Sequence, residues 1–195
     1  MQTALIALAA YLLGSISFAV VVSRLMGLPD PHSYGSKNPG ATNVLRSGSK
    51  LAAVLTLVGD TGKGVLAVFL AAQFTGEDPA IGYDAPIAGA MALLGHLYPV
   101  FHGFLGGKGV ATAAGVLLAL NPWLGLGVLA TFAIIIAFFR MVSLASMIAA
   151  GVSFAAVQFT PWAALAVVVC LDCSIAALVL SCSSLSVRLT VVVAF

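Results

Sequence analysis

Charged side chains are scarce in this sequence. Lys, Arg, Asp and Glu make up 7% of its 195 residues, 62% of the residues are hydrophobic, and the mean hydropathy is +1.15. Soluble domains carry about 25% charged residues, so 8 basic and 6 acidic side chains are too few to cover a water-soluble chain of this length. The composition excludes a soluble domain and predicts a polytopic membrane protein.

Basic residues are absent before the first apolar run, which extends from Thr3 to about Leu25. This run is longer than the hydrophobic region of a signal peptide, which also begins with positive charge. We therefore expect a retained first span. Its basic flank is Arg24, which favours an outer N-terminus and an inner first loop.

Cysteine is rare, and all 3 residues follow position 169. Cys170 and Cys173 form a CxxC pair, a pattern that in other settings indicates redox or metal chemistry. Here the pair lies in an apolar segment with no histidine or βαβ pattern nearby. We interpret these cysteines as small buried residues on one helix face, so no metal site is expected.

The apolar runs predict an all-α fold, a membrane helix bundle of six or seven transmembrane helices, some of them short or broken. A span needs about 20 apolar residues. After the first run, further runs cover about 51–74, 87–101, 110–120, 123–139, 142–159 and 161–180. Asn121-Pro122 predicts a break or turn. Internal repeats are not evident, so residues 1–195 are expected to form a single domain.

The few charges alternate in sign from loop to loop. Segments 27–50, 103–109 and 140–142 contain or adjoin most of the Lys and Arg residues, whereas segment 75–86 holds only acids. Cytoplasmic loops carry the excess of basic residues. The three basic loops are therefore predicted to share the cytoplasmic face.

The first basic loop contains GSKNPGATNVLR, residues 35–46. Glycines such as Gly35 and Gly40 allow positive φ, which lets successive N–H groups turn toward one point. Arg46 adds a planar fork of donors suited to phosphate or carboxylate. The uncharged donors and acceptors are Ser36, Thr42 and Asn43. Two interpretations stay open here: a cradle for an oxyanion, and a turn-rich cytoplasmic loop without a site.

The second basic loop lies in GHLYPVFHGFLGGKGVATAAG, residues 95–115. Its centre is GGKG, in which Lys108 is surrounded by glycines immediately before a helix pattern, an arrangement that favours anion binding. The P-loop pattern GxxxxGK[ST] does not fit, because His102 replaces its first glycine and Gly109 its Ser or Thr. A nucleotide hydrolase is therefore not expected.

Three ionisable residues lie within or beside apolar runs. Asp60 and Lys63 are three positions apart on one helical face, so they either form an ion pair between helices or serve a site, and we prefer a role for Asp60 in positioning a basic group. His96 is either structural or a general acid/base. His32 and His102 are weaker candidates.

Two cationic, glycine-rich loops on one face of a membrane bundle indicate two phosphate-bearing ligands, or one ligand with two anionic ends. The surrounding spans offer apolar surface for a fatty chain, which favours a lipid-like substrate and a small phosphorylated partner. Two other functions stay open: a transporter of a phosphorylated metabolite or another anion, and a non-catalytic binder of anionic lipid headgroups.

Gly14-Ser15 and the segments 35–46 and 95–112 closely resemble the first two motifs of the bacterial acyl-phosphate:glycerol-3-phosphate acyltransferase (PlsY) family, from residue 4 to about 165. The resemblance implies a multi-pass enzyme of the bacterial inner membrane with its active site toward the cytoplasm. It further implies transfer of a fatty acyl group from acyl phosphate to the 1-hydroxyl of glycerol 3-phosphate, giving lysophosphatidic acid for phospholipid biosynthesis. No metal or other cofactor is implied, and an acyl-phosphate-producing enzyme would supply the donor.

The resemblance also implies roles for individual residues. Ser36, Arg46, Lys108 and His96 correspond to catalytic positions. The substrate and phosphate binders would be Gly35, Asn38, Gly40, Thr42, Asn43, Gly106, Gly107, Gly109 and Thr112, with Asp60 and Lys63 in support.

The C-terminal residues depart from the family pattern. The resemblance implies a third motif, a basic stretch with an asparagine and a later glutamate, but residues 171–195 contain neither, and Arg188 is their only basic residue. We interpret this end as frameshifted or otherwise altered, so the activity of this chain cannot be taken from the resemblance.

Overall fold

The structure is a computed structural model that describes residues 1–76, 78–79, 82–139, 145, 148–149 and 151. Its helices are α1 (Gln2–Gly14), α2 (Phe18–Leu25), α3 (Ala41–Leu45), α4 (Lys50–Thr75), α5 (Asp84–Leu97), the 3₁₀ helix η1 (Val100–His102), α6 (Val110–Leu120) and α7 (Pro122–Phe139). No strand occurs among the described residues. The predicted all-α fold is confirmed for this part of the chain.

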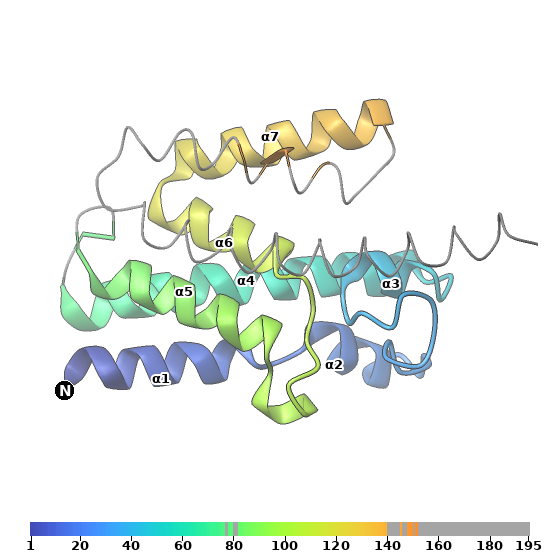
Figure 1. The fold of residues 1–195 in the computed structure, drawn as a ribbon, viewed down its shortest axis with the longest axis horizontal. Coiled ribbons are helices and arrows are strands. Elements are labelled where there is room, and N and C mark those ends of the chain that lie inside the picture. Colours follow the sequence, from blue (N-terminus) through green and yellow to red (C-terminus); the bar gives the residue numbers. More distant parts are fainter. Residues whose placement is uncertain (77, 80–81, 140–144, 146–147, 150, 152–195) are drawn as a thin grey trace, which may run out of the picture.

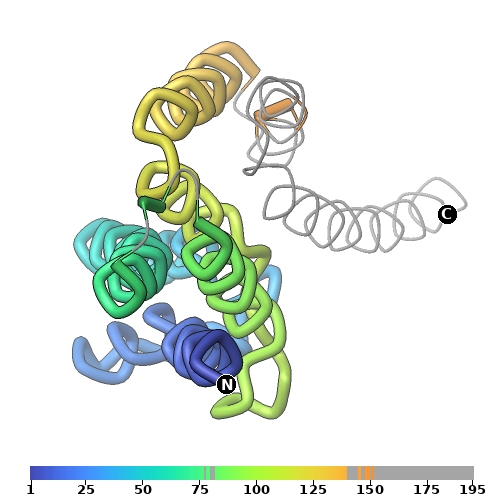
Figure 2. Tube along the Cα trace, turned by 90° about the vertical axis from the view of Figure 1, so that its left-hand side faces the viewer, coloured from blue at the N-terminus to red at the C-terminus, as the bar shows by residue number. Residues whose placement is uncertain are grey.

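The long helix α4 forms the centre of the bundle (Figure 1). It packs against α5 and α6 on one side and against α2 and α3 at its beginning, while α1 packs mainly against α5 and α7 against α6. Figure 2 shows the bundle from the side of the N-terminus, with α1 nearly end on. The central helix therefore contacts every helix that carries a predicted site residue, namely α3, α5 and α6.

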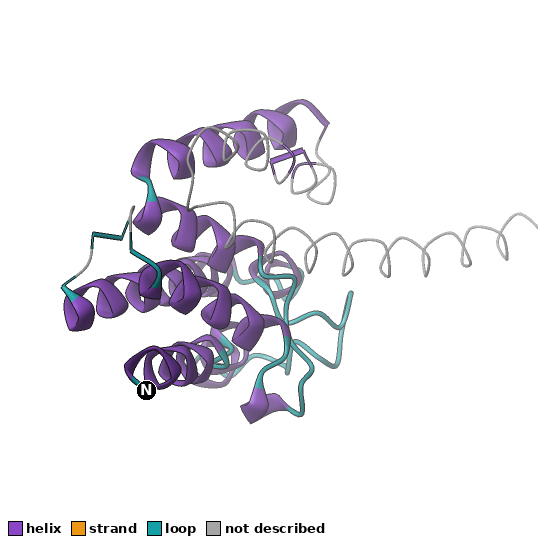
Figure 3. Cartoon of the chain, turned by 60° about the vertical axis from the view of Figure 1, so that its left-hand side comes forward, coloured by secondary structure: helices purple, strands orange, loops and turns teal. Residues whose placement is uncertain are grey.

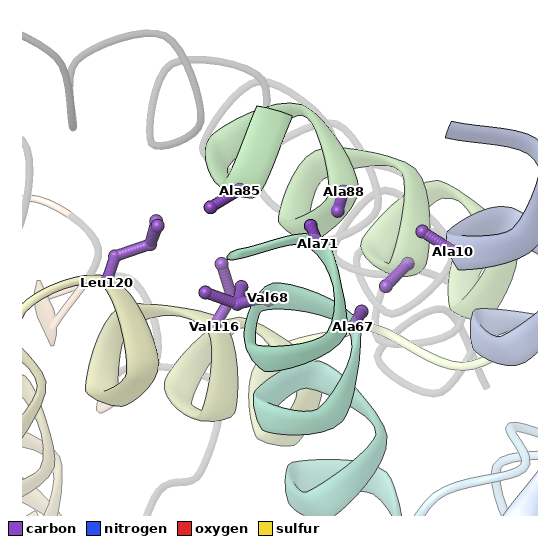
Figure 4. Packing of buried hydrophobic residues seen from close by; sticks show 9 residues of the cluster. Ala10, Ala67, Val68, Ala71, Ala85, Ala88, Val116 and Leu120 are labelled. Carbon is purple, nitrogen blue, oxygen red and sulfur yellow. The ribbon is translucent and has the colours of Figure 1, made fainter. Parts of the chain in front are cut away.

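The core is built from small side chains. Figure 4 shows the largest buried cluster, which consists of Ala10, Ala67, Val68, Ala71, Ala85, Ala88, Ala92, Val116 and Leu120. Glycines bring the backbones still closer, because a Cβ at Gly64 would overlap the Thr112 carbonyl and one at Gly115 would overlap the Thr61 carbonyl. Small residues at helix contacts are typical of membrane bundles, where close approach replaces the hydrophobic effect.

The outer surface is apolar instead. On α4 the side chains of Leu57, Val58 and Phe69 are exposed, whereas Asp60 and Lys63 on the same helix are buried. This polarity is opposite to that of a soluble bundle and suits a helix that faces lipid.

By length and composition, α4 and α7 could each cross a membrane, and the bent pair α1 and α2 could form one more span. These counts concern only the residues that the structure describes. The spans predicted at 142–159 and 161–180, the Cys170–Cys173 pair, the loop at 140–142 and the altered segment 171–195 lie outside the described residues.

The first apolar run forms two helices where the sequence suggested one continuous span. α1 and α2 meet at a bend of 41°. The Ser15 hydroxyl donates to the Tyr11 carbonyl at 2.9 Å, a backbone contact that often bends helices. The carbonyl of Ile16, within the break, accepts from Lys63 at 2.8 Å. The break is therefore stabilised by a side chain from another helix.

The predicted interruption at Asn121-Pro122 is confirmed. α6 ends at Leu120 and α7 begins at Pro122. The Asn121 side-chain oxygen accepts from the backbone N–H groups of Trp123 and Leu124, each at 3.1 Å. Asparagine before a first-turn proline is a favourable helix start, because the amide oxygen satisfies free N–H groups and proline needs none.

The polar loops lie at one end of the bundle. The N-terminus and the α4–α5 connection are at the other end (Figure 1), where the Gln2 side chain donates to the Phe74 carbonyl at 3.3 Å. Residues 26–49 and 98–109 gather at the loop end, as Figure 3 shows. Basic residues thus occupy the loop end, while Asp78 and Asp84 lie in or beside the opposite connection.

Candidate functional site

A buried ion pair connects α4 to the break between α1 and α2. Lys63 Nζ lies 2.9 Å from Asp60 Oδ1 and donates to the Ile16 carbonyl oxygen at 2.8 Å. Both charged residues are 2% exposed. The expectation that they face the bundle interior is correct, and the ammonium has a charged partner and a backbone partner.

His96 joins this pair to α6. Its Nδ1 lies 3.2 Å from Thr112 Oγ1 and 3.5 Å from Asp60 Oδ1, so α4, α5 and α6 meet around one imidazole. The ring is buried. Since an ionised carboxylate only accepts hydrogen bonds, Asp60 favours the tautomer with a proton on Nδ1. In the neutral ring the other nitrogen, Nε2, then carries a lone pair.

The glycine loop, which we define as residues 106–109, crosses directly over this imidazole. The Gly107 N–H donates to the His96 carbonyl at 3.1 Å. A Cβ at Gly107 would overlap His96 Nε2, and a Cβ at Gly106 would overlap the carbonyl oxygens of His96 and Leu97. Glycine is required at both positions because the loop backbone lies against the end of α5.

The same loop leads into α6. Gly109 has φ +77°, a left-handed conformation that favours glycine, and the helix begins at Val110. The first-turn N–H groups of α6 therefore follow Lys108 directly, and the Lys108 side chain is half-buried. A lysine beside a helix N-terminus gives this loop a positive local field.

The first loop is shaped by one buried amide. Asn43 is 3% exposed, and its Nδ2 donates to the carbonyls of Pro31 at 2.8 Å and Tyr34 at 3.2 Å. Its Oδ1 accepts from the Ser36 N–H at 3.0 Å. The amide that the sequence suggested as a ligand to phosphate thus makes its hydrogen bonds to the loop backbone.

The chemically versatile side chains of this loop point outward. Ser36, Thr42 and Arg46 are exposed, and Asn38 and Gly40 are half-buried. The Arg46 guanidinium lies over Gly35, where an added Cβ would be 3.3 Å from a guanidinium nitrogen. Gly35 has φ +58°, which explains glycine at a turn that passes beneath a bulky cation.

The two loops touch each other. His32 Nε2 lies 3.1 Å from the carbonyl oxygen of Leu105, next to the glycine loop. The His32 and His102 rings are stacked with centroids 6.4 Å apart. The first two basic loops therefore share one end of the bundle, as the charge pattern predicted for them.

Sequence reasoning missed two of these connections. His32 was a weak candidate, and its partner lies 73 positions away. The Ile16 carbonyl has no side-chain signature at all. For metals, the part of the chain described by the structure contains no group of three or more His, Cys, Asp and Glu residues that could hold an ion.

Known proteins share both the sequence and the fold. Residues 4–192 match the family described as glycerol-3-phosphate acyltransferase. A curated relative of that name from Cupriavidus taiwanensis is 66% identical over 153 residues, which cover 77% of this chain and 74% of the relative. Another from Ralstonia pickettii is 63% identical over 151 residues, covering 76% of this chain and 72% of the relative.

Two solved structures are similar as well. Crystal structures of PlsY, an integral membrane glycerol 3-phosphate acyltransferase, match in the glycerol 3-phosphate form with a TM-score of 0.82 and 35% identity, covering 90% of this chain and 87% of that chain. The lysophosphatidic acid form matches with a TM-score of 0.81 and 33% identity, covering 98% of this chain and 93% of that chain.

Proposed function

The chain belongs to the glycerol-3-phosphate acyltransferase family of integral membrane proteins, and on that basis we propose that it transfers a fatty acyl group from acyl phosphate to the 1-hydroxyl of glycerol 3-phosphate. The products are lysophosphatidic acid and inorganic phosphate. Residues 1–195 form one catalytic domain in this proposal.

One observation carries the proposal: the two cationic, glycine-rich loops touch at one end of the bundle. His32 Nε2 and the Leu105 carbonyl oxygen are 3.1 Å apart. Both substrates bear a phosphate, and bringing two phosphates together requires cations and N–H donors from two directions. Arg46 on one loop and Lys108 on the other provide one cation each.

The exposed side chains of the first loop bind phosphate in this mechanism. Arg46 donates to phosphate oxygens through its planar fork, and Ser36 adds a hydroxyl. The glycine loop contributes Lys108 and backbone N–H groups, which stabilise the negative charge that develops on the carbonyl oxygen. The remaining binding positions proposed are Gly35, Asn38, Gly40, Thr42, Gly106, Gly107 and Gly109.

The acyl transfer needs no covalent intermediate on the protein, because phosphate is a good leaving group. The hydroxyl oxygen of glycerol 3-phosphate forms a bond to the acyl carbonyl carbon, and the bond from that carbon to the phosphate oxygen breaks. Positioning the reacting atoms about 3–3.5 Å apart supplies much of the rate enhancement. The hydroxyl proton passes either to a phosphate oxygen or to His96.

His96 is suited to the second route by its surroundings. With Nδ1 turned toward Thr112 and Asp60, its Nε2 faces Gly107 in the glycine loop. The Asp60 carboxylate lies beside Nδ1 of the ring, and Lys63 pairs with that carboxylate in the bundle interior. These two residues, with Thr112 and Asn43, support the loops that contact substrate.

We further propose the bacterial inner membrane as the location, with the loop end toward the cytoplasm. The basic residues at the loop end and the acidic residues at the opposite connection support this orientation. The acyl phosphate would come from a separate acyl-phosphate-producing enzyme.

Product analysis of the purified chain tests the function. The protein in lipid nanodiscs is incubated with radiolabelled glycerol 3-phosphate and one of three donors, namely acyl phosphate, acyl-CoA or acyl carrier protein thioester. Lysophosphatidic acid acylated at the 1-position, formed from acyl phosphate alone, is the expected result. Uptake of glycerol 3-phosphate into liposomes without product would instead identify the transporter alternative, and headgroup binding without either would identify a lipid binder.

A further inference from the structure

Both ring nitrogens of His32 face hydrogen-bond acceptors. Its Nδ1 lies 2.8 Å from Asp30 Oδ1, and its Nε2 lies 3.1 Å from the carbonyl oxygen of Leu105. The ring is only 24% exposed. The first partner belongs to the same loop as His32, whereas the second belongs to the connection that enters the glycine loop.

A neutral imidazole cannot satisfy this arrangement, since it carries one N–H and one lone pair. The Asp30 carboxylate stays ionised: the His32 backbone N–H, which donates to Oδ1 at 2.9 Å, lowers the pKa of Asp30. Burial opposes this effect, while the His32 ring and Arg24 add to it. In the neutral state either Asp30 or the Leu105 carbonyl would therefore face a lone pair, which is repulsive.

We propose that His32 is a positioning residue that ties the glycine loop to the first loop, and that it does so as an imidazolium. Two N–H donors then meet two acceptors, and one of these hydrogen bonds joins the loops. The role in turnover rests on the proposed acyltransferase function, whereas the connection between the loops does not.

The neighbouring groups are compatible with a cation at this position. Three charged or titratable groups surround His32: Asp30 in its own loop, His102 stacked on the ring, and Arg24. The charge of Arg24 lowers the pKa of both Asp30 and His102. Burial lowers the pKa of His102, and the charges of His32 and Arg24 lower it further. The backbone hydrogen bond with Ser15 and the charge of Asp30 raise the pKa of His102, but the net shift is downward, so a second cation beside the imidazolium is disfavoured and Asp30 supplies the counter-charge.

Protonation of His32 would then control how firmly the glycine loop is held. His96 holds the loop from the α5 side through the Gly107 N–H. His32 holds its entrance from the opposite side through Leu105. The stabilising form is the protonated one, so the second connection is complete in the imidazolium, and the neutral ring leaves one of the two acceptors without a donor.

Hydrogen exchange tests this independently of catalysis. Backbone exchange of residues 103–109 is compared between the wild type and His32→Gln, which keeps one donor and one acceptor but no charge, at about pH 5.5 and about pH 8. We expect the variant to exchange about ten- to a hundredfold faster at the lower pH, the effect of losing one charged hydrogen bond, and to approach the wild type at the higher pH.

His32→Arg provides the positive test, since guanidinium donates to both acceptors at every pH. We expect slow exchange of residues 103–109 at both pH values. Lys50→Gln, an exposed charge removal at the same end of the bundle, is the matched control and should leave this exchange unchanged.

Three results would overturn the proposal. The first is equal exchange in the wild type and His32→Gln at both pH values, and the second is a ratio of the His32→Gln rate to the wild-type rate that does not change with pH. The third is exchange in His32→Arg as fast as in His32→Gln. If the wild type makes lysophosphatidic acid, we also expect His32→Gln to raise KM for glycerol 3-phosphate at about pH 5.5 and His32→Arg to keep it near the wild-type value. A wild type that makes no product would refute the proposed function. The exchange ratios would still show whether His32 ties the glycine loop to the first loop.

Discussion

Gly107→Ala adds one methyl group where the glycine loop crosses the His96 imidazole. The added Cβ would overlap His96 Nε2. The ring cannot turn aside easily, because Nδ1 lies 3.2 Å from Thr112 Oγ1 and 3.5 Å from Asp60 Oδ1 inside the bundle. The loop must therefore move away from α5.

The required movement sets the size of the effect. Carbon and nitrogen atoms at ordinary contact lie about 3.5 Å apart, so the loop must shift by about one ångström or more. Misplacement by about one ångström reduces turnover roughly a hundredfold, and overpacking of this kind destabilises the fold by about 1–3 kcal/mol. We expect kcat for lysophosphatidic acid formation to fall by about that factor, with a smaller change in KM.

The assay uses purified protein in nanodiscs with thermal unfolding measured in parallel. Gly62→Ala is the matched control, because nothing lies within 4 Å of a Cβ at that position in α4, and it should retain nearly full turnover. Adding Gly107→Ala to a His96→Ala background should cause little further loss of Tm, since the ring that the methyl group meets has been removed. Wild-type kcat and Tm in Gly107→Ala alone would refute the argument.

Three further predictions concern the remaining site residues. Arg46→Ala and Lys108→Ala should each lower kcat about 10²- to 10³-fold, the cost of losing one preorganised donor. Near-normal turnover of either purified variant would exclude the substituted residue from the mechanism. Asp60→Asn leaves the Lys63 ammonium buried without its counter-charge and should destabilise the fold by about 3–5 kcal/mol; an unchanged unfolding midpoint in nanodiscs would contradict this. Asn43→Ala removes three hydrogen bonds within the first loop, so faster hydrogen exchange across residues 31–36 is expected, whereas Thr42→Ala should leave that exchange unchanged.

Some of the fold could be predicted because local chemistry determines it. The bounds of α4 follow from a long apolar run, and the break before Pro122 follows from a proline that cannot continue a helix. The common location of the basic loops follows from the distribution of Lys and Arg. The inward direction of Asp60 and Lys63 follows from the cost of exposing charge to lipid.

The remaining features depend on contacts between distant segments. Residues 3–25 are apolar almost throughout, so the bend at Ser15 was not predictable; its Ile16 carbonyl is satisfied by Lys63, 47 positions away. His32 and Leu105 are likewise brought together only by the packed bundle. Asn43 was predicted as a phosphate binder, and its amide instead hydrogen-bonds the backbone of its own loop. A sequence cannot distinguish an amide that binds substrate from one that folds its own loop.

The hydrogen bond from Lys63 to the Ile16 carbonyl also limits which sequences this architecture tolerates. An unpaired carbonyl at that depth would need another donor, because hydrocarbon offers none. A descendant with an apolar residue at position 63 must either straighten residues 15–17 into one continuous helix or admit a water molecule there. Straightening would swing α1 or α2 by up to the 41° that now separates them and would disturb the helices beneath both loops.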